Sequence, residues 1–236
     1  MTESKKLNIK FDSGRHFKAK VGFVLLATEQ TIEDDMYELM PKEVGKHFSR
    51  VPIPDSITNE TLLNLANDLG PSASQILPDG SLDVITYACT SGSLVVGEER
   101  VFQELAKGAP KAVKTSLITS VIRALKTINA KKIVVATPYL DEINQKEKDY
   151  MISQGLDILD IQGLQLEKDS EMIKVTPDYL LQFAQSLDRA DADAIFISCG
   201  ALRSIDIIEE LEARTKKPVS TSNQAVAWAV MRLAGV

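Results

Sequence analysis

Asp83-Val-Ile-Thr-Tyr-Ala-Cys89 returns later in the chain as Asp193-Ala-Ile-Phe-Ile-Ser-Cys199, with the same spacing between aspartate and cysteine. Each stretch is a nearly continuous apolar run, which is typical of a parallel strand buried on both faces. A second pair of runs keeps almost the same offset, because Lys20-Val-Gly-Phe-Val-Leu-Leu-Ala-Thr28 resembles Lys131-Lys-Ile-Val-Val-Ala-Thr137. The two offsets are 110 residues (83 to 193) and 109 residues (28 to 137). Two strands that keep their register over this distance indicate a duplicated unit.

Helical patterns separate these apolar runs, so the chain is expected to have an α/β fold with parallel sheets covered by helices. The predicted strands are residues 21–27, 84–88, 133–136 and 194–198. The predicted helices are residues 56–69, 114–127, 145–154, 177–187, 204–214 and 223–233. We expect two lobes: residues 1–108, completed by residues 219–236, and residues 109–218. Ligands of such units bind beyond the carboxyl ends of the strands, which predicts a site in the cleft between the lobes.

The composition describes an ordinary globular protein. The chain has 236 residues, of which 44% are hydrophobic, and its net charge of -6 gives no support for a nucleic-acid surface. We find no signal peptide and no apolar window of membrane-spanning length, and therefore expect a cytoplasmic protein without membrane contact. Neither nucleotide-binding glycine motif is present, and His16 and His47 lack metal-ligand spacing. No cofactor and no metal are expected.

Cys89 and Cys199 are the candidate catalytic residues. Both follow a predicted strand and precede a helical pattern, and a helix N-terminus lowers the pKa of a thiol. An isolated cysteine in this position would more often be a small core residue. Packing alone does not explain two thiols at equivalent strand ends, whereas a cleft between related lobes can use one on each side of a substrate. The pair therefore favours acid/base or addition chemistry.

Hydroxyl groups lie beside these strand ends. Thr90 and Ser91 belong to a small turn, Thr90-Ser-Gly-Ser93, that can hold a carboxylate or a developing enolate. Helix capping alone also explains serine and threonine at such a junction. Tyr139 closes the third predicted strand within Thr137-Pro-Tyr139 and can offer its hydroxyl to the cleft, although a surface tyrosine is the simpler alternative.

Four motifs together carry a resemblance to a known family. Ala88-Cys-Thr-Ser-Gly92, Ala136-Thr-Pro-Tyr139, Ser198-Cys-Gly-Ala-Leu202 and Ser222-Asn-Gln-Ala225 resemble the aspartate/glutamate racemase superfamily. The most similar branch contains the maleate cis-trans isomerases and the arylmalonate decarboxylases. The resemblance extends from Val21 to Gly235 and implies two flavodoxin-like lobes related by a pseudo-twofold axis. It also implies cofactor-free catalysis by a pair of cysteines.

The resemblance assigns roles to individual residues. Cys89 resembles the cysteine that attacks maleate, or one acid/base thiol of a racemase, and Cys199 resembles its partner. Arylmalonate decarboxylases have glycine at the first position, so two thiols favour isomerisation or racemisation. Thr90, Ser91 and Tyr139 resemble the residues with which those decarboxylases hold a carboxylate. Gly200, beside Cys199, is expected to contact the substrate as well.

Two positions depart from the maleate isomerase pattern. Ala27-Thr-Glu-Gln-Thr31 places Glu29 near an asparagine of those enzymes, and Asp169 in Leu166-Glu-Lys-Asp-Ser170 lies nearest to a second one. Carboxylates would repel a second substrate carboxylate and attract an ammonium or amidine group. We therefore expect Glu29 and Asp169 to contact a nitrogen-bearing acid, as in the ectoine-utilisation branch that the first stretch resembles.

The leading hypothesis is a cofactor-independent isomerase or racemase of a small carboxylic acid, in which Cys89 and Cys199 are opposed. A decarboxylase of malonate-type acids that uses Cys199 alone is the first alternative. A binding protein that kept the fold and lost the chemistry is the second. A small carboxylate is the expected ligand, and a homo-oligomer is the expected assembly.

Overall fold

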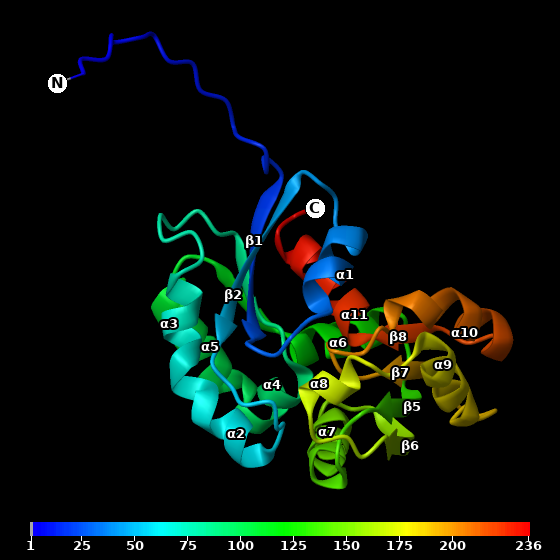
Figure 1. The fold of residues 1–236 in the computed structure, drawn as a ribbon. Coiled ribbons are helices and arrows are strands. Elements are labelled where there is room, and N and C mark those ends of the chain that lie inside the picture. The colour runs from blue at the N-terminus through cyan, green and yellow to red at the C-terminus, as the bar shows by residue number, and fades with distance from the viewer. Residues whose placement is uncertain (1) are drawn as a thin grey trace.

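The computed structural model describes residues 2–236 and contains two four-stranded parallel sheets (Figure 1). The first sheet has the strand order β2-β1-β3-β4, and the second has the order β6-β5-β7-β8. The strands of the first sheet are β1 (Ala19–Leu26), β2 (Val44–Val51), β3 (Val84–Tyr87) and β4 (Val113–Ser116). Those of the second are β5 (Lys132–Thr137), β6 (Asp157–Gly163), β7 (Ala194–Ile197) and β8 (Val219–Thr221). The equivalent orders confirm the α/β fold that the repeat predicts.

The aspartate of the repeated stretch anchors the same strand pair in each sheet. In the first sheet, an Asp83 carboxylate oxygen accepts a hydrogen bond from the Lys20 N–H at the start of β1. In the second, Asp193 accepts from the N–H groups of Lys131 and Lys132 at the start of β5. The spacing from aspartate to cysteine is therefore the length of one central strand, from its anchored start to its carboxyl end.

Eleven α-helices cover the sheets. Their bounds are α1 (Ile32–Leu39), α2 (Asn59–Asn64), α3 (Leu69–Ser74), α4 (Thr90–Val96), α5 (Glu98–Gly108), α6 (Leu117–Thr127), α7 (Asp141–Ser153), α8 (Asp169–Met172), α9 (Pro177–Ser186), α10 (Ile208–Thr215) and α11 (Ser222–Leu233), within residues 2–236. Two short 3₁₀ helices, η1 (Leu65–Asp68) and η2 (Ile205–Ile207), precede α3 and α10. None of the helices in this part of the chain has the length and apolarity to cross a membrane.

Both faces of each sheet are buried. Along β1, Val21, Phe23 and Leu25 belong to one apolar cluster, whereas Val24 and Leu26 belong to another. The first cluster also contains residues of α6 and α11, which pack against each other between the two sheets (Figure 1). This two-sided burial explains why the central strands are continuous apolar runs.

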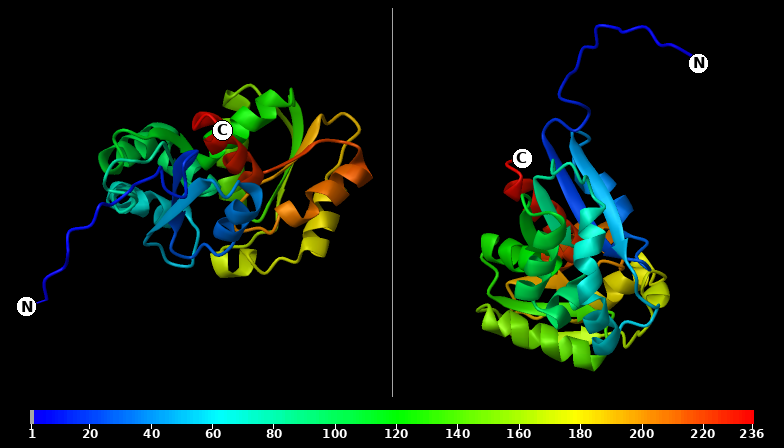
Figure 2. Two further views of the ribbon diagram at one scale, coloured as in Figure 1. Left: turned by 90° about the horizontal axis from the view of Figure 1, so that it is seen from above. Right: turned by 90° about the vertical axis from the view of Figure 1, so that its left-hand side faces the viewer.

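Several elements differ from the predicted ones. The predicted helix at residues 114–127 starts only at Leu117, because Val113–Ser116 pairs with β3 as strand β4. The predicted helix at residues 56–69 is divided into α2 and η1, and α3 follows. Strand β4 belongs to the first sheet although it follows residue 108, where the first lobe was expected to end. Strand β8 belongs to the second sheet although it follows residue 218, where the second lobe was expected to end. Residues 2–15 form an extended arm that leaves the body (Figure 2), whereas the ring of His16 packs against His47 of β2.

Helices α3 and α5 approach each other closely at Gly108. A Cβ atom at this position would lie 2.4 Å from the carbonyl oxygen of Gly70 and 2.6 Å from the Ser74 nitrogen. Both neighbours are backbone atoms, which cannot rotate away from the clash.

We expect Gly108→Ala to destabilise the protein by about 1–3 kcal/mol, because overpacking outweighs the better helix propensity of alanine. Urea unfolding followed by circular dichroism measures this difference. Gln103→Ala, at an exposed position of the same helix, is the control and should change the free energy of unfolding little. Equal stability of Gly108→Ala and wild type would contradict the close approach.

Candidate active site

A narrow cavity lies beyond the carboxyl ends of the central strands of both sheets. The structure brings every predicted site residue into its lining. These are Glu29, Cys89, Thr90, Ser91, Tyr139, Asp169, Cys199 and Gly200, and apolar residues including Leu26, Ile57 and Met172 complete the wall. The roles of these residues in binding and catalysis remain predictions.

Cys89 occupies the N-cap position of α4, directly after β3. Its sulfur accepts a hydrogen bond from the Gly92 N–H at 3.2 Å and lies 3.6 Å from the Ser91 hydroxyl oxygen. The predicted helix start is therefore present at this cysteine. The expected low thiol pKa is wrong, however, because burial raises the pKa of Cys89 to about 11 although the Ser91 and Gly92 hydrogen bonds oppose the change.

Cys199 is held differently. It follows β7, but a turn and not a helix comes next, since η2 begins only at Ile205. Its φ is +107°, a backbone conformation that residues with a side chain rarely adopt. The Ala201 N–H donates to its sulfur at 3.4 Å. Burial, together with the nearby Asp169 carboxylate, nevertheless raises the pKa of Cys199 well above its usual value.

Both cysteines are therefore neutral thiols in this cavity, and not the thiolates expected at helix N-termini. Desolvation disfavours a charged sulfur in an enclosed cavity, and this cost exceeds the stabilisation by the local N–H groups. A thiol in such a place is suited to donate a proton to a carbanion. The same N–H groups support the thiolate once the proton has moved.

The hydroxyl groups of Thr90, Ser91 and Tyr139 also line the cavity. The Thr90 and Ser222 hydroxyl oxygens are 3.0 Å apart. Tyr139 is buried near both cysteines, and burial followed by the charge of Cys199 raises the pKa of its hydroxyl well above the usual value. A neutral phenol of this kind is a hydrogen-bond donor at neutral pH.

Two carboxyl groups, of Glu29 and Asp169, also line the cavity. Glu29 and Asp169 are only 6% and 3% exposed. One Glu29 oxygen accepts from the Thr31 and Ile32 N–H groups at 2.5 and 2.9 Å, and one Asp169 oxygen accepts from the Thr28 hydroxyl at 2.6 Å. Burial raises the pKa of Glu29 to about 7, with Asp169 adding to the shift, and raises the pKa of Asp169 as well.

In the described part of the chain, these carboxyl groups share the cavity wall with no cationic side chain. Among residues 2–236, no lysine, arginine or histidine lines the cavity. Within the same part of the chain, no group of three or more histidine, cysteine, aspartate or glutamate side chains is arranged to hold a metal ion.

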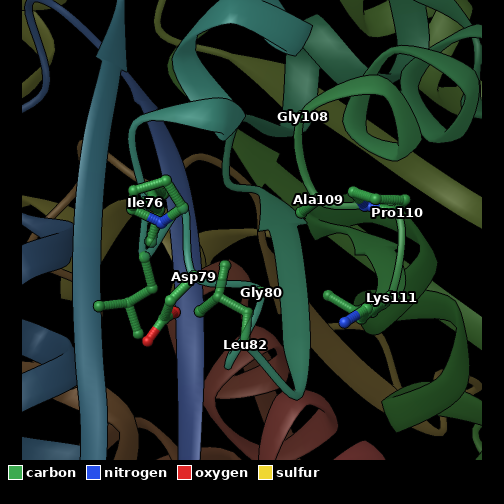
Figure 3. A pocket seen from close by; sticks show the side chains of 11 residues that line it. Ile76, Asp79, Gly80, Leu82, Gly108, Ala109, Pro110 and Lys111 are labelled. Carbon is green, nitrogen blue, oxygen red and sulfur yellow. The ribbon is translucent and has the colours of Figure 1, made fainter.

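A larger pocket opens at the surface elsewhere in the first lobe (Figure 3). Asp79, Gly80 and Lys111 contribute to its lining, from the loops that lead into β3 and β4. It is thus at the amino ends of the strands, and none of the predicted site residues lines it. Since ligands of parallel α/β sheets bind at the carboxyl ends, the cysteine-lined cavity is the better candidate site.

Buried polar residues next to the cavity were not predicted as functional. Ser222 and Asn223 belong to a motif that carried the family resemblance, but the sequence assigned them no role. Glu147 in α7 is completely buried and accepts a hydrogen bond from the Ser198 hydroxyl at 2.6 Å. The sequence could have indicated Glu147, because this glutamate falls on the apolar face of the helix predicted at residues 145–154.

Two sheets of equivalent strand order, each supplying one cysteine to a common cavity, define a duplicated α/β protein with a two-cysteine site. Residues 55–236 match the family model of arylmalonate decarboxylase, and the chain belongs to this family. The family resemblance read from the four motifs is thereby confirmed.

Individual relatives support the same placement. The chain is 25% identical to the maleate isomerase of Nocardia farcinica over 225 residues, 90% of this chain and 89% of that protein. It is 29% identical to the arylmalonate decarboxylase of Bordetella bronchiseptica over 123 residues, 51% of each chain. A cysteine-to-serine mutant of Nocardia farcinica maleate cis-trans isomerase, with a covalently bound succinylcysteine intermediate, has the same fold, with a TM-score of 0.85, 23% identity and coverage of 92% and 93%. These relatives give no support to the ectoine-utilisation branch.

Glu147 makes the stability of the protein depend on pH. Burial raises its pKa from 4.5 to about 7, against the opposing effect of the Ser198 hydrogen bond. Between pH 4.5 and about pH 7, Glu147 therefore keeps its proton in the folded protein and loses it in the unfolded chain. Because the folded state binds more protons, the stability from this group is complete below pH 4.5 and falls as the pH rises to about 7.

We expect Glu147→Gln to remove this fall, so that the variant gains up to about 3 kcal/mol over wild type between pH 5 and pH 8. Glutamine keeps the acceptor for Ser198 without a charge. Urea unfolding at both pH values measures the gain. Glu142→Gln, at an exposed position of α7, is the control. A gain that does not depend on pH would show that Glu147 does not ionise in this range.

Proposed function

We propose that the protein is a cofactor-independent isomerase or racemase of a small carboxylic acid, in which Cys89 and Cys199 act from opposite sides of the substrate. One observation carries the proposal. The two cysteines, which end equivalent strands of two equivalent sheets, line the same small cavity. The matched maleate isomerases agree with this class of reaction.

The substrate carboxylate binds to the hydroxyl groups of Thr90, Ser91 and Tyr139. These groups donate hydrogen bonds that strengthen as negative charge accumulates on the carboxylate oxygens. They therefore stabilise the enediolate that forms when a proton leaves the adjacent carbon. Since the cavity is nearly closed to water, the effect of each donor is larger than in solution.

In a racemisation, one of the two neutral thiols first releases its proton to solvent, so that the reaction starts from one thiolate and one thiol. The thiolate takes the proton from the α-carbon and becomes a thiol, and the opposite thiol gives its proton to the other face of the same carbon. The protein ends with the two protonation states exchanged. The Gly92 and Ala201 N–H groups stabilise whichever sulfur is charged.

In a cis-trans isomerisation, the Cys89 thiolate instead adds to one carbon of the double bond while Cys199 protonates the other. Rotation about the former double bond, which is now a single carbon–carbon bond, follows. Cys199 then removes a proton as the carbon–sulfur bond breaks. The covalent succinylcysteine of the Nocardia farcinica isomerase structure motivates this variant of the mechanism.

Decarboxylation is the second candidate, favoured by the match to the arylmalonate decarboxylase family model. In this reaction a malonate-type acid loses carbon dioxide, and the resulting enediolate takes a proton from Cys199. Cys89 has no necessary part in it. The presence of a thiol at position 89 is the reason for preferring the two-cysteine reaction.

The substrate we favour carries a positively charged nitrogen in addition to its carboxylate. Glu29 and Asp169 each use one oxygen for the hydrogen bonds described above and leave the other available in the cavity. A second carboxylate placed there would be repelled, whereas an ammonium or amidinium group would be attracted. Such a cation would also supply the charge compensation that the cavity wall lacks.

Serine substitution of each cysteine tests the reaction. With maleate, aspartate, glutamate and phenylmalonate in deuterated water, followed by NMR, we expect Cys89→Ser and Cys199→Ser each to lose at least about a hundredfold in interconversion. In a racemase, deuterium exchange from one face survives in each variant. In an addition mechanism, only Cys89→Ser also loses a thioether adduct in mass spectrometry.

A decarboxylase would tolerate Cys89→Ser and release carbon dioxide from phenylmalonate. Full activity of both variants in every assay would refute the two-cysteine mechanism. Circular dichroism of both variants checks that the fold is retained.

Neutralising the two carboxyl groups tests the substrate class. We expect Glu29→Gln with Asp169→Asn to raise kcat/KM for maleate relative to aspartate by about tenfold or more, because like charges in a desolvated site cost several kcal/mol. Both amides keep the acceptor oxygens for Thr31 and Thr28. Glu33→Gln, at a half-exposed residue that pairs with Arg50, is the control. An unchanged ratio would mean that Glu29 and Asp169 do not contact the variable part of the substrate.

A further inference from the structure

We propose that Thr31, Ser222 and Asn223 are positioning residues that hold the backbone around Cys199 and thereby fix the position of its thiol. They bind three consecutive residues of the chain. The Cys199 N–H donates to the Ser222 hydroxyl at 3.0 Å, the Asn223 amide donates to the Gly200 carbonyl at 2.8 Å, and the Thr31 hydroxyl donates to the Ala201 carbonyl at 3.0 Å.

The conformation of Cys199 requires such support. Its φ of +107° is unfavourable for any residue with a Cβ atom, and strain of this kind persists only where the surroundings impose it. Regular secondary structure does not impose it here, because the segment lies between β7 and η2. The three side-chain hydrogen bonds are the contacts that fix the peptide groups on either side of the strained residue.

The packing around the loop leaves it little freedom to move. A Cβ atom at Gly200 would lie 2.6 Å from the Cδ1 atom of Ile32 in α1. The loop is therefore pressed against the first turn of α1. Asn223 is oriented in turn by Asp35 of α1, whose carboxylate accepts from the same amide nitrogen at 2.7 Å.

Cys89 does not depend on these residues in the same way. It has an ordinary φ of -139°, and its own helix α4 supplies the Gly92 N–H that binds its sulfur. Thr31 and Asn223 make none of the hydrogen bonds found at Cys89 within residues 2–236. Ser222 is the exception, because its hydroxyl also contacts Thr90, the neighbour of Cys89.

This difference makes the inference testable without a substrate, so it stands or falls independently of the proposed reaction. Removing the hydrogen-bonding group of Thr31, Ser222 or Asn223 should increase transient opening of the loop around Cys199. The Cys199 thiol should then be more accessible to an alkylating reagent. Cys89 serves as a reference thiol in the same molecule. A general loss of stability would increase the alkylation rates of both cysteines, whereas a loss of positioning at the Cys199 loop would increase the rate of Cys199 alone.

The experiment is alkylation by iodoacetamide at pH 8, with the rate at each cysteine followed by mass spectrometry of peptides. For Thr31→Val we expect the Cys199 rate to rise about three- to tenfold, the effect of losing one hydrogen bond, while the Cys89 rate stays at the wild-type value. Asn223→Leu loses the hydrogen bonds to both Gly200 and Asp35, so its Cys199 rate should rise at least as much, again without a change at Cys89. Thr31→Ser retains the hydroxyl and should restore the wild-type ratio. Thr115→Val, at a buried threonine of β4 that hydrogen-bonds outside this loop, is the matched control.

Ser222→Ala provides a third variant in case one of the others does not fold, and here both rates are expected to change, that of Cys199 more. An unchanged Cys199 rate in the folded variants would overturn the proposal. An equal rise at both cysteines in Thr31→Val would also overturn it, because it would assign Thr31 to general stability.

Discussion

The carboxyl ends of two equivalent strands meet at one small cavity, and most properties of this protein depend on that meeting. Asp83 and Asp193 anchor the starts of β3 and β7 to the neighbouring strands, and each strand then runs its length to a cysteine. Helices α6 and α11 fill the space between the sheets and hold the two ends in place. The duplication thus places one cysteine of each sheet at the cavity between the lobes.

Desolvation dominates the electrostatics of the site. Two thiols and two carboxyl groups lie in a cavity without a lysine, arginine or histidine in the described lining. Burial raises the pKa of each of these groups, and for the cysteines it outweighs the N–H donors at the sulfurs. The cavity thus favours neutral groups. A ligand that brings positive charge beside Glu29 and Asp169 would shift this balance toward the ionised carboxylates.

The two cysteines are equivalent in topology but not in local structure. Cys89 is the N-cap of α4 and has an ordinary backbone, whereas Cys199 lies in a strained turn held from outside. The groups that hold Cys199 come from α11 and from the residue before α1, far from it along the chain. Of the two cysteine segments in residues 2–236, Thr31 and Asn223 bind the Cys199 loop alone, whereas the Ser222 hydroxyl contacts both Cys199 and Thr90, the neighbour of Cys89.

The amino-acid sequence was sufficient to predict the α/β class, the duplication, the central strands and eight of the residues that line the cavity. The strands and the residues directly after them are visible as local apolar runs, whereas Glu29 and Asp169 were placed through the family resemblance, and the apolar part of the wall was not predicted. The edge strands β2 and β6 were missed because half-exposed strands with charged residues lack a continuous apolar signal. Strand β4, Val113-Lys-Thr-Ser116, is mostly polar, and β8 has only three residues. The protonation of the thiols and the conformation of Cys199 were set by tertiary contacts alone. The pKa of a thiol depends on how much water surrounds it, and the φ of Cys199 depends on partners such as Thr31, which folding alone brings to it.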